Sequence, residues 1–138
     1  MTPGELPHRI PPKRILVVDD GPQLGKVFRM VLTTGGGHTV EITQDAESAL
    51  AMFEPGKYDL VITDLKLPRM NGFDLATAIK NRSATQPVML ITGHAEMIKW
   101  EPDAVSKIDL LLEKPFSLQQ LQEALAKMFA PQHPAPGS

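Results

Sequence analysis

The sequence predicts an α/β fold in which a parallel sheet is covered by helices on both faces. Short apolar runs typical of strands alternate with segments of helical period, giving five strand–helix units. The run at residues 60–62 contains no polar residue, which is typical of a central strand buried on both faces. The length of 138 residues corresponds to one domain that can bury a substantial core.

The predicted strands lie at residues 14–18, 38–43, 60–62, 87–91 and 108–112; four are mainly apolar, and the one at 38–43 is indicated by the alternation of Val40 and Ile42. Right-handed crossovers leave few ways to connect them in one parallel sheet. The helices between them are predicted from apolar residues spaced three and four apart. The residues expected to face the sheet are, helix by helix, Leu24, Val27, Phe28, Val31 and Leu32; Ala46, Ala49, Leu50 and Phe53; Leu75, Ala78 and Ile79; and Leu118, Leu121, Leu125 and Met128.

Several predicted helices begin or end at residues suited to helix ends. Pro22 suits the first turn of the first helix, and the glycines at 35–37 end it. Asp45 can cap the second helix, which should end at residues 55–56, and Asn71 can cap the third. A short fourth helix is predicted from Ala95 to Trp100, stopped by Pro102, with a turn at 103–107 after it.

The last predicted helix has the clearest local signal in the chain. Ser117 and Gln120 have the spacing of a capping box, in which each side chain bonds the backbone amide of the other. Phe116 and Leu121 flank them as a hydrophobic staple. We therefore expect the helix to begin directly after Ser117.

Composition and charge exclude several classes of protein. Apolar residues make up 42% of the chain and charged residues 22%, and the net charge of −2 gives no basic surface for nucleic acid. There is no cysteine, no secretory signal and no apolar run as long as a membrane span, so we expect a cytoplasmic protein. Prolines predict loose tails at residues 1–12 and 131–138, around a domain at 13–130.

Polar residues follow four of the predicted strands. They are Asp19 and Asp20 after the first, Asp64 after the third, Thr92 after the fourth and Lys114 after the fifth. Taken alone, Asp64 is more simply interpreted as a turn residue. Parallel strands, however, bring their carboxyl ends to one edge of the sheet, where α/β proteins bind ligands.

Three carboxylates at one edge repel one another unless a cation lies between them. Oxygen ligands with room for water suit Mg²⁺, so we expect this cofactor. Lys114 and the Thr92 hydroxyl can then bind phosphoryl oxygens. A carboxylate can accept a phosphoryl group, and Asp64 is the natural acceptor at this edge.

These motifs resemble the receiver domain of bacterial response regulators, the CheY-like family. They are Val17-Val18-Asp19-Asp20, Asp64-Leu65-Lys66-Leu67-Pro68-Arg69-Met70-Asn71-Gly72, Thr92-Gly93 and Lys114-Pro115-Phe116. The resemblance covers about residues 13–130. It implies a flavodoxin-like, doubly wound sheet of strand order 2-1-3-4-5.

The resemblance also implies roles for the site residues. The Mg²⁺ ligands would be the carboxylates of Asp20 and Asp64, the backbone carbonyl of Lys66 and, through a water molecule, Asp19. Asp64 would receive its phosphoryl group from a phospho-histidine on a sensor kinase or a histidine phosphotransfer protein. Lys114 would bind the phosphoryl group, and Thr92 would be the hydroxyl that moves toward it. The protein would then be a signalling switch that promotes its own phosphorylation and dephosphorylation, rather than an enzyme acting on other substrates.

The chain departs from the family pattern at two positions. Gly21 replaces the acid that often follows the acidic pair, and Leu111 stands where the family places a switch aromatic. Lys66 and His94 occupy positions that tune dephosphorylation in the family, although exposed surface residues would look the same.

Two alternatives stay open from the sequence. A phosphatase of the haloacid-dehalogenase type also forms an aspartyl-phosphate, but it carries a second Asp two residues after the first, where this chain has Lys66. A binding module with a receiver fold would need no phosphate, which the intact acids, Thr92 and Lys114 argue against. We expect output through protein contacts, to a target or a second copy, at the face of the fourth helix, fifth strand and last helix.

Overall fold

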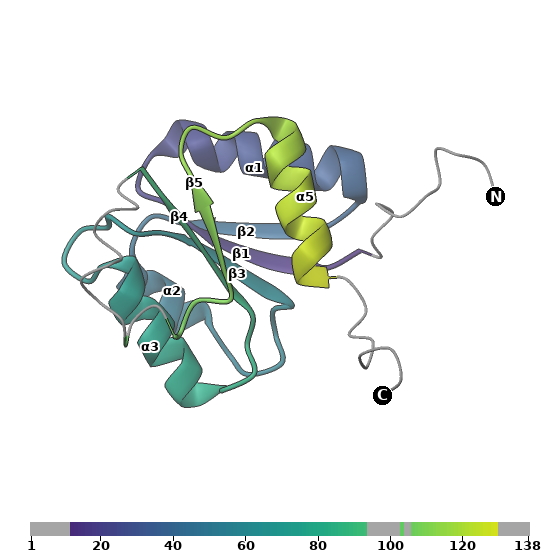
Figure 1. Ribbon diagram of the computed structural model, residues 1–138. Coiled ribbons are helices and arrows are strands. Elements are labelled where there is room, and N and C mark those ends of the chain that lie inside the picture. The colour runs from purple at the N-terminus through teal and green to yellow at the C-terminus, as the bar shows by residue number, and fades with distance from the viewer. Residues whose placement is uncertain (1–11, 94–102, 104–105, 130–138) are drawn as a thin grey trace, which may run out of the picture.

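A computed structural model of the chain describes residues 12–93, 103 and 106–129 (Figure 1). Its strands are β1 (Arg14–Val18), β2 (Thr39–Thr43), β3 (Leu60–Asp64), β4 (Val88–Thr92) and β5 (Leu110–Glu113). They form one sheet of order β2-β1-β3-β4-β5, and every neighbouring pair is parallel. The predicted strand order is therefore confirmed. No helix in these described ranges is long and apolar enough to cross a membrane.

Two pairs of helices cover the two faces of the sheet, as Figure 1 shows. The helices are α1 (Pro22–Gly36), α2 (Ala46–Met52), α3 (Gly72–Arg82) and α5 (Leu118–Phe129). On one face Ile15 and Val17 of β1 pack in a cluster with α1 and α5. On the other face Leu16 and Val18 pack in a cluster with α2 and α3. Successive residues of a strand point to opposite faces, so one apolar run supplies both cores.

The helix ends follow the local signals in the sequence. Pro22 opens α1, and Gly37 ends it with a φ of 69° that favours glycine. Asp45 caps α2 by accepting a hydrogen bond from the Ser48 amide at 2.7 Å. Asn71 caps α3 in the same way. The helix predicted at 95–100 and the tails at 1–11 and 131–138 lie outside the described residues.

The capping box of α5 is formed in both directions. The Gln120 amide donates to the Ser117 hydroxyl at 3.0 Å, and the Ser117 amide donates to the Gln120 side-chain carbonyl at 2.7 Å. Phe116 packs against the apolar cluster that contains Leu121, as a hydrophobic staple requires. The predicted capping box is confirmed.

Several boundaries and faces differ from the sequence prediction. α2 ends at Met52, before residues 55–56, because Phe53 takes an extended conformation and is buried. Val27 is 43% exposed and Leu118 54% exposed, although both were expected to face the sheet. Ala78 of α3 is only half-buried. The predicted stripe is therefore wrong at Val27 and Leu118 and is confirmed at the residues that are buried, Phe28, Leu32, Leu75, Ile79, Leu121 and Leu125.

Candidate active site

The site residues meet at the carboxyl edge of the sheet. The ladders pair Val18 with Thr63, Asp64 with Ile91, and Thr92 with Glu113, so the four strands end at nearly the same level. Asp19 and Asp20 directly follow β1, Asp64 ends β3, Thr92 ends β4 and Lys114 directly follows β5. The parallel topology therefore gathers all of these predicted residues at one edge.

Three carboxylates form a cluster at this edge. Oxygens of Asp19, Asp20 and Asp64 all lie within 4.8 Å of one another. Asp19 is buried, Asp20 is exposed, and the Asp64 side chain is 11% exposed. The cluster thus runs from the interior to the solvent, with Asp64 between the two extremes.

The carboxyl group of Asp19 lies in an environment that disfavours its charged form. One carboxylate oxygen, Oδ1, accepts a hydrogen bond from the Gly21 amide at 2.7 Å. The other, Oδ2, is buried without a hydrogen-bond partner among the described residues. Burial raises the pKa of Asp19, the Gly21 hydrogen bond opposes this, and the charge of Asp64 raises the pKa further. A buried carboxylate oxygen without a partner, beside two further carboxylates, fits a hard cation such as Mg²⁺.

Gly21 has a function at the site that the sequence analysis did not find. A Cβ at this position would lie 3.3 Å from Asp19 Oδ1, so a side chain would press on the oxygen that the Gly21 amide binds. The departure from the family pattern at this position therefore removes an acid and leaves space around Asp19. The signal in the sequence was a glycine directly after an acidic pair.

Lys114 supplies the positive charge. Its Nζ lies 2.9 Å from Asp64 Oδ2, and it donates a hydrogen bond to that oxygen. The Lys114 amide donates to the carbonyl of Thr92 at 2.8 Å, which ties the end of β5 to the end of β4. The Lys114–Pro115 peptide bond that follows is cis. Thr92 itself is buried. Asp64, Thr92 and Lys114 are thus brought together as predicted.

The loop after β3 closes back on the end of its own strand. The Gly72 amide donates to the carbonyl of Leu65 at 2.8 Å. A Cβ at Gly72 would lie 2.3 Å from the carbonyl oxygen of Asp64, a distance that no side chain tolerates. Glycine is therefore required for this close approach. Lys66 lies in the same loop with its side chain exposed.

This combination of fold and site defines a flavodoxin-like protein with an acidic cluster and a lysine at the carboxyl edge of its sheet. The profile of the response regulator receiver domain family matches residues 15–126. The chain belongs to that family, so it is the receiver domain of a response regulator in two-component signalling. Receiver domains act as signalling switches, bind Mg²⁺ at an acidic pocket and pair with sensor kinases.

Relatives of known sequence agree with this assignment. The chemotaxis protein CheY of Pseudomonas aeruginosa is 30% identical over 118 residues, which are 84% of this chain and 95% of CheY. The transcriptional regulatory protein TcrA of Mycobacterium tuberculosis is 32% identical over 119 residues. That match covers 86% of this chain, and the chain spans about half of TcrA, 47% of its length.

Solved structures agree as well. The non-phosphorylated receiver domain of HemR from Leptospira biflexa matches with a TM-score of 0.77 and 28% identity, covering 88% of this chain and 97% of that one. The response regulator TrrA from Thermotoga maritima, in complex with Mg²⁺ and BeF, matches with a TM-score of 0.74 and 30% identity. That match covers 84% of this chain and 98% of TrrA. Because the chain belongs to the receiver domain family, the alternative of a haloacid-dehalogenase-type phosphatase is wrong.

Proposed function

We propose that Asp64 accepts a phosphoryl group from a phospho-histidine of a sensor kinase or a histidine phosphotransfer protein. The observation that carries this proposal is the 2.9 Å contact between Lys114 Nζ and Asp64 Oδ2. Within the acidic cluster, Asp64 has the lysine beside it and is neither buried like Asp19 nor exposed like Asp20. A carboxylate oxygen attacks phosphorus, the phosphorus–nitrogen bond breaks, and the leaving imidazole takes up a proton.

The acidic cluster would hold the Mg²⁺ ion. Asp20, Asp64 and the Lys66 backbone carbonyl would bind it directly, and Asp19 would bind through water. The burial of Asp19 and its unpartnered oxygen support this set, as does the Mg²⁺ complex of TrrA. When bound, the ion neutralises charge on the carboxylates and on the transferred group. The remaining negative charge would be paired by Lys114.

The signal would leave the site through Thr92. Phosphorylation adds close to two negative charges and three acceptor oxygens. The Thr92 hydroxyl would turn toward them from the end of β4, and this shift would bias a pre-existing equilibrium at neighbouring surfaces. Leu111 is 36% exposed on β5 and has no ring or hydroxyl to carry the movement. The change would then reach the segment at 94–102, which lies outside the described residues.

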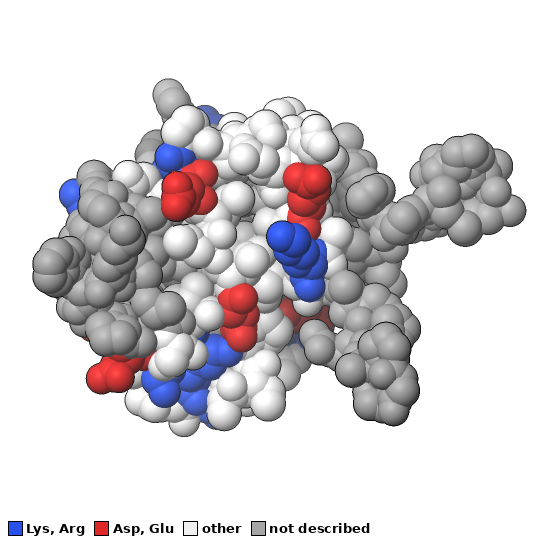
Figure 2. Space-filling view, viewed as in Figure 1, with Lys and Arg blue, Asp and Glu red and all other residues white. Residues whose placement is uncertain are grey.

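The output surface would be formed by β5, α5 and the segment between β4 and β5, and a downstream protein or a second copy would bind there. Leu111 and Leu118 supply exposed apolar area on β5 and α5. Figure 2 shows acidic and basic side chains interspersed on the face that it presents, without a large basic patch. Together with the net charge of −2, the mixed charges on this face support a protein rather than nucleic acid as the direct partner. Location in the cytoplasm stays a prediction.

Labelling by a small phosphodonor tests the proposal. With acetyl phosphate and Mg²⁺, the wild-type protein should acquire one acid-labile phosphoryl group, and Asp64→Asn should acquire none. Asp74→Asn is a matched control, because Asp74 is exposed in the first turn of α3 and lies outside the acidic cluster. Omission of Mg²⁺ should prevent labelling of the wild type. Equal labelling of Asp64→Asn would overturn the assignment, and an unlabelled wild type would favour a phosphate-independent binding module.

A further inference from the structure

The loop between Asp64 and α3 contains a backbone turn of unfavourable geometry. The Met70 amide donates to the carbonyl of Pro68 at 2.8 Å, so residues 68–70 form a γ-turn. Its central residue, Arg69, has a φ of 67° and is the one non-glycine residue with a positive φ in the described part of the chain. A residue with a Cβ carries a free-energy cost in this conformation, and such strain persists only where surrounding contacts impose it.

The side chain of Arg69 contacts the beginning of α2. Its Nε lies 3.2 Å from Glu47 Oε2, and Nη2 lies 3.7 Å from Asp45 Oδ2. Asp45 is the N-cap of α2 and Glu47 lies in its first turn, so both acids are held by a regular element. One guanidinium therefore joins the top of the γ-turn to a fixed point on the neighbouring helix.

Apolar contacts hold the loop on either side of this turn. Leu67 and Met70 are half-buried against the cluster formed with α2 and α3, and Leu65 is buried. Lys66 lies between two of these anchors with its side chain in solvent. The direction of its backbone carbonyl therefore depends on the path of the whole loop, including the γ-turn three residues later.

We propose that Arg69 is a positioning residue for the metal site. By pairing with Asp45 and Glu47, it holds the γ-turn in its left-handed conformation and thereby directs the Lys66 carbonyl toward the acidic cluster. This inference rests on the proposed function, in which that carbonyl is a Mg²⁺ ligand. The side chain of Arg69 is 64% exposed, so the proposed effect on the bound ion would act through the loop and not by direct contact.

Calorimetry on the whole chain measures the Mg²⁺ affinity of Arg69→Ala. This measurement distinguishes a positioning effect of Arg69 from the electrostatic effect of its positive charge on the cation. Removal of a positive charge near an acidic cluster would by itself strengthen cation binding. Positioning predicts the opposite, a dissociation constant raised about twofold to fivefold, the range expected for exposed ion pairs. Tighter or unchanged binding would overturn the proposal.

Three further variants test the mechanism. Arg69→Lys keeps a cation for Glu47 and should restore most of the affinity. Arg69→Gly loses the ion pairs but adopts a positive φ without strain, so its affinity should fall between those of wild type and Arg69→Ala. Glu47→Gln weakens cation binding by its charge alone, so it is compared in the wild-type and Arg69→Ala proteins: positioning predicts a smaller loss of Mg²⁺ affinity when Arg69 is already absent, and Glu123→Gln on the exposed side of α5 should have little effect in either. Equal losses for Arg69→Gly and Arg69→Ala would contradict a conformational mechanism.

Amide exchange without Mg²⁺ gives a readout that does not depend on phosphorylation. The Met70 amide, bonded to Pro68, should exchange faster in Arg69→Ala than in wild type, and Arg69→Lys should restore its protection. Faster exchange with unchanged Mg²⁺ affinity would show a purely structural ion pair and overturn the proposal. Absence of Asp64 labelling in the wild type would instead overturn the proposed function. Labelling therefore tests the proposed function, and Mg²⁺ affinity with amide exchange tests the role of Arg69.

Discussion

The amino and carboxyl ends of the strands form two edges of the sheet, and both contain charged and polar side chains. The two edges differ in how far these side chains are paired with one another. At the amino edge, the structure shows three pairs of charged or polar side chains, Arg14 with Asp59, Lys80 with Asp109 and Tyr58 with Glu41. At the carboxyl edge, three carboxylates share one lysine, and a buried oxygen has no hydrogen-bond partner within the described ranges. The carboxyl edge, with its excess of negative charge, is therefore the edge that fits a ligand, because a bound cation would supply the missing positive charge.

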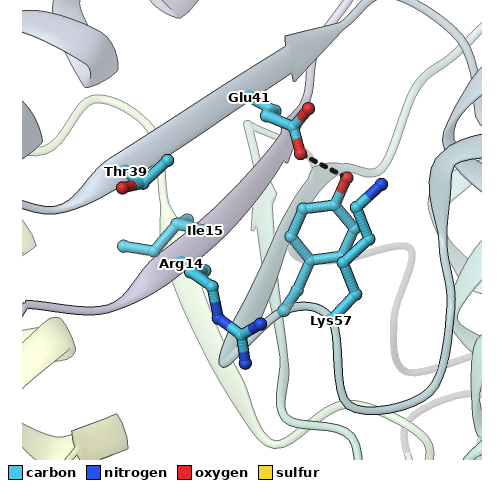
Figure 3. Close-up of a pocket in the computed structure, with 6 residues that line it drawn as sticks. Arg14, Ile15, Thr39, Glu41 and Lys57 are labelled. Atoms are coloured by element: carbon cyan, nitrogen blue, oxygen red, sulfur yellow. Dashed lines mark hydrogen bonds between the residues drawn. The ribbon is translucent and has the colours of Figure 1, made fainter.

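The amino edge shows the paired arrangement in detail. A shallow hollow of about 210 Å³ opens there beside β1 and β2 (Figure 3). The Tyr58 hydroxyl donates to Glu41 at 2.6 Å, and burial together with this hydrogen bond raises the pKa of Tyr58 well above its usual range. The Arg14 guanidinium donates to the Gly56 carbonyl, and its Nε lies 3.6 Å from Asp59 Oδ2, which also accepts the Arg14 backbone amide at 2.8 Å. These contacts tie the segment before β3 to β1 and β2, and each carboxylate in them accepts at least one hydrogen bond.

The largest effect that we expect at the amino edge comes from Asp109→Ala. Asp109 accepts hydrogen bonds from Lys80 Nζ at 2.7 Å and from the Val88 amide at 2.8 Å. Removal of the carboxylate leaves both donors without this partner, and the Lys80 side chain is only 12% exposed. The free energy of unfolding should fall by about 2 kcal/mol, as measured by urea denaturation. Labelling by acetyl phosphate should stay unchanged, and its loss would contradict the division between the two edges.

Ser117→Ala tests a purely structural group close to the carboxyl edge. Ser117 follows Lys114 by three residues, and its hydroxyl accepts the Gln120 amide to cap α5. The substitution should lower the free energy of unfolding by about 1 kcal/mol. Gln119→Ala, at the neighbouring exposed position, is the matched control and should have a much smaller effect. An unchanged denaturation midpoint for Ser117→Ala would count against the cap.

Asp19→Asn should stabilise the protein when Mg²⁺ is absent. The pKa of Asp19 is raised in the folded state, mainly by burial, so its charged form destabilises the fold at neutral pH and this effect disappears as the pH falls through the raised pKa. Removal of the charge should raise the free energy of unfolding at pH 7 by on the order of 1 kcal/mol. Added Mg²⁺ should raise the melting temperature of wild type more than that of the variant. A destabilised Asp19→Asn variant would show that the charge of Asp19 does not lower the free energy of unfolding.

The smallest expected effect concerns His38 at the amino edge. Its Nδ1 accepts the Lys13 amide at 2.9 Å, and its ring packs 6.3 Å from that of Phe129. Burial, and then the charge of Lys13, lower the pKa of His38, so the unfolded chain takes up the proton first as the pH falls below about 6.5. Stability should therefore decrease on acidification.

Comparison with His38→Gln isolates this contribution. The side chain of glutamine does not titrate, so the advantage of wild type over the variant should shrink by less than about 1 kcal/mol between pH 8 and pH 5. Denaturation curves of the two proteins at both pH values measure the difference. An advantage that does not change with pH would show that His38 does not contribute to the pH dependence.

The sequence by itself determined the number of strands, the caps and the edge at which the site lies. The central strands are visible as apolar runs because a central parallel strand is buried on both faces, whereas the outer strand β2 shows only the alternation of Val40 and Ile42. The caps at Asp45, Asn71 and Ser117 depend on bonds to residues three positions away, so a short window contains the whole interaction. The placement of Asp64 and Lys114 at the same edge follows from parallel pairing, because Asp64 ends β3 and Lys114 directly follows β5.

Only the tertiary structure decided how each of these residues is held. Asp64 and Lys114 are 50 positions apart, and their 2.9 Å contact depends on how β3 and β5 are placed by β4 between them. Asp19 is buried and Asp20 is exposed although they are adjacent in sequence, because burial depends on the surrounding elements. The pairing of Arg69 with Glu47 crosses from a loop to a neighbouring helix for the same reason. Contacts between distant segments are properties of the packed chain, and no local pattern in the sequence contains them.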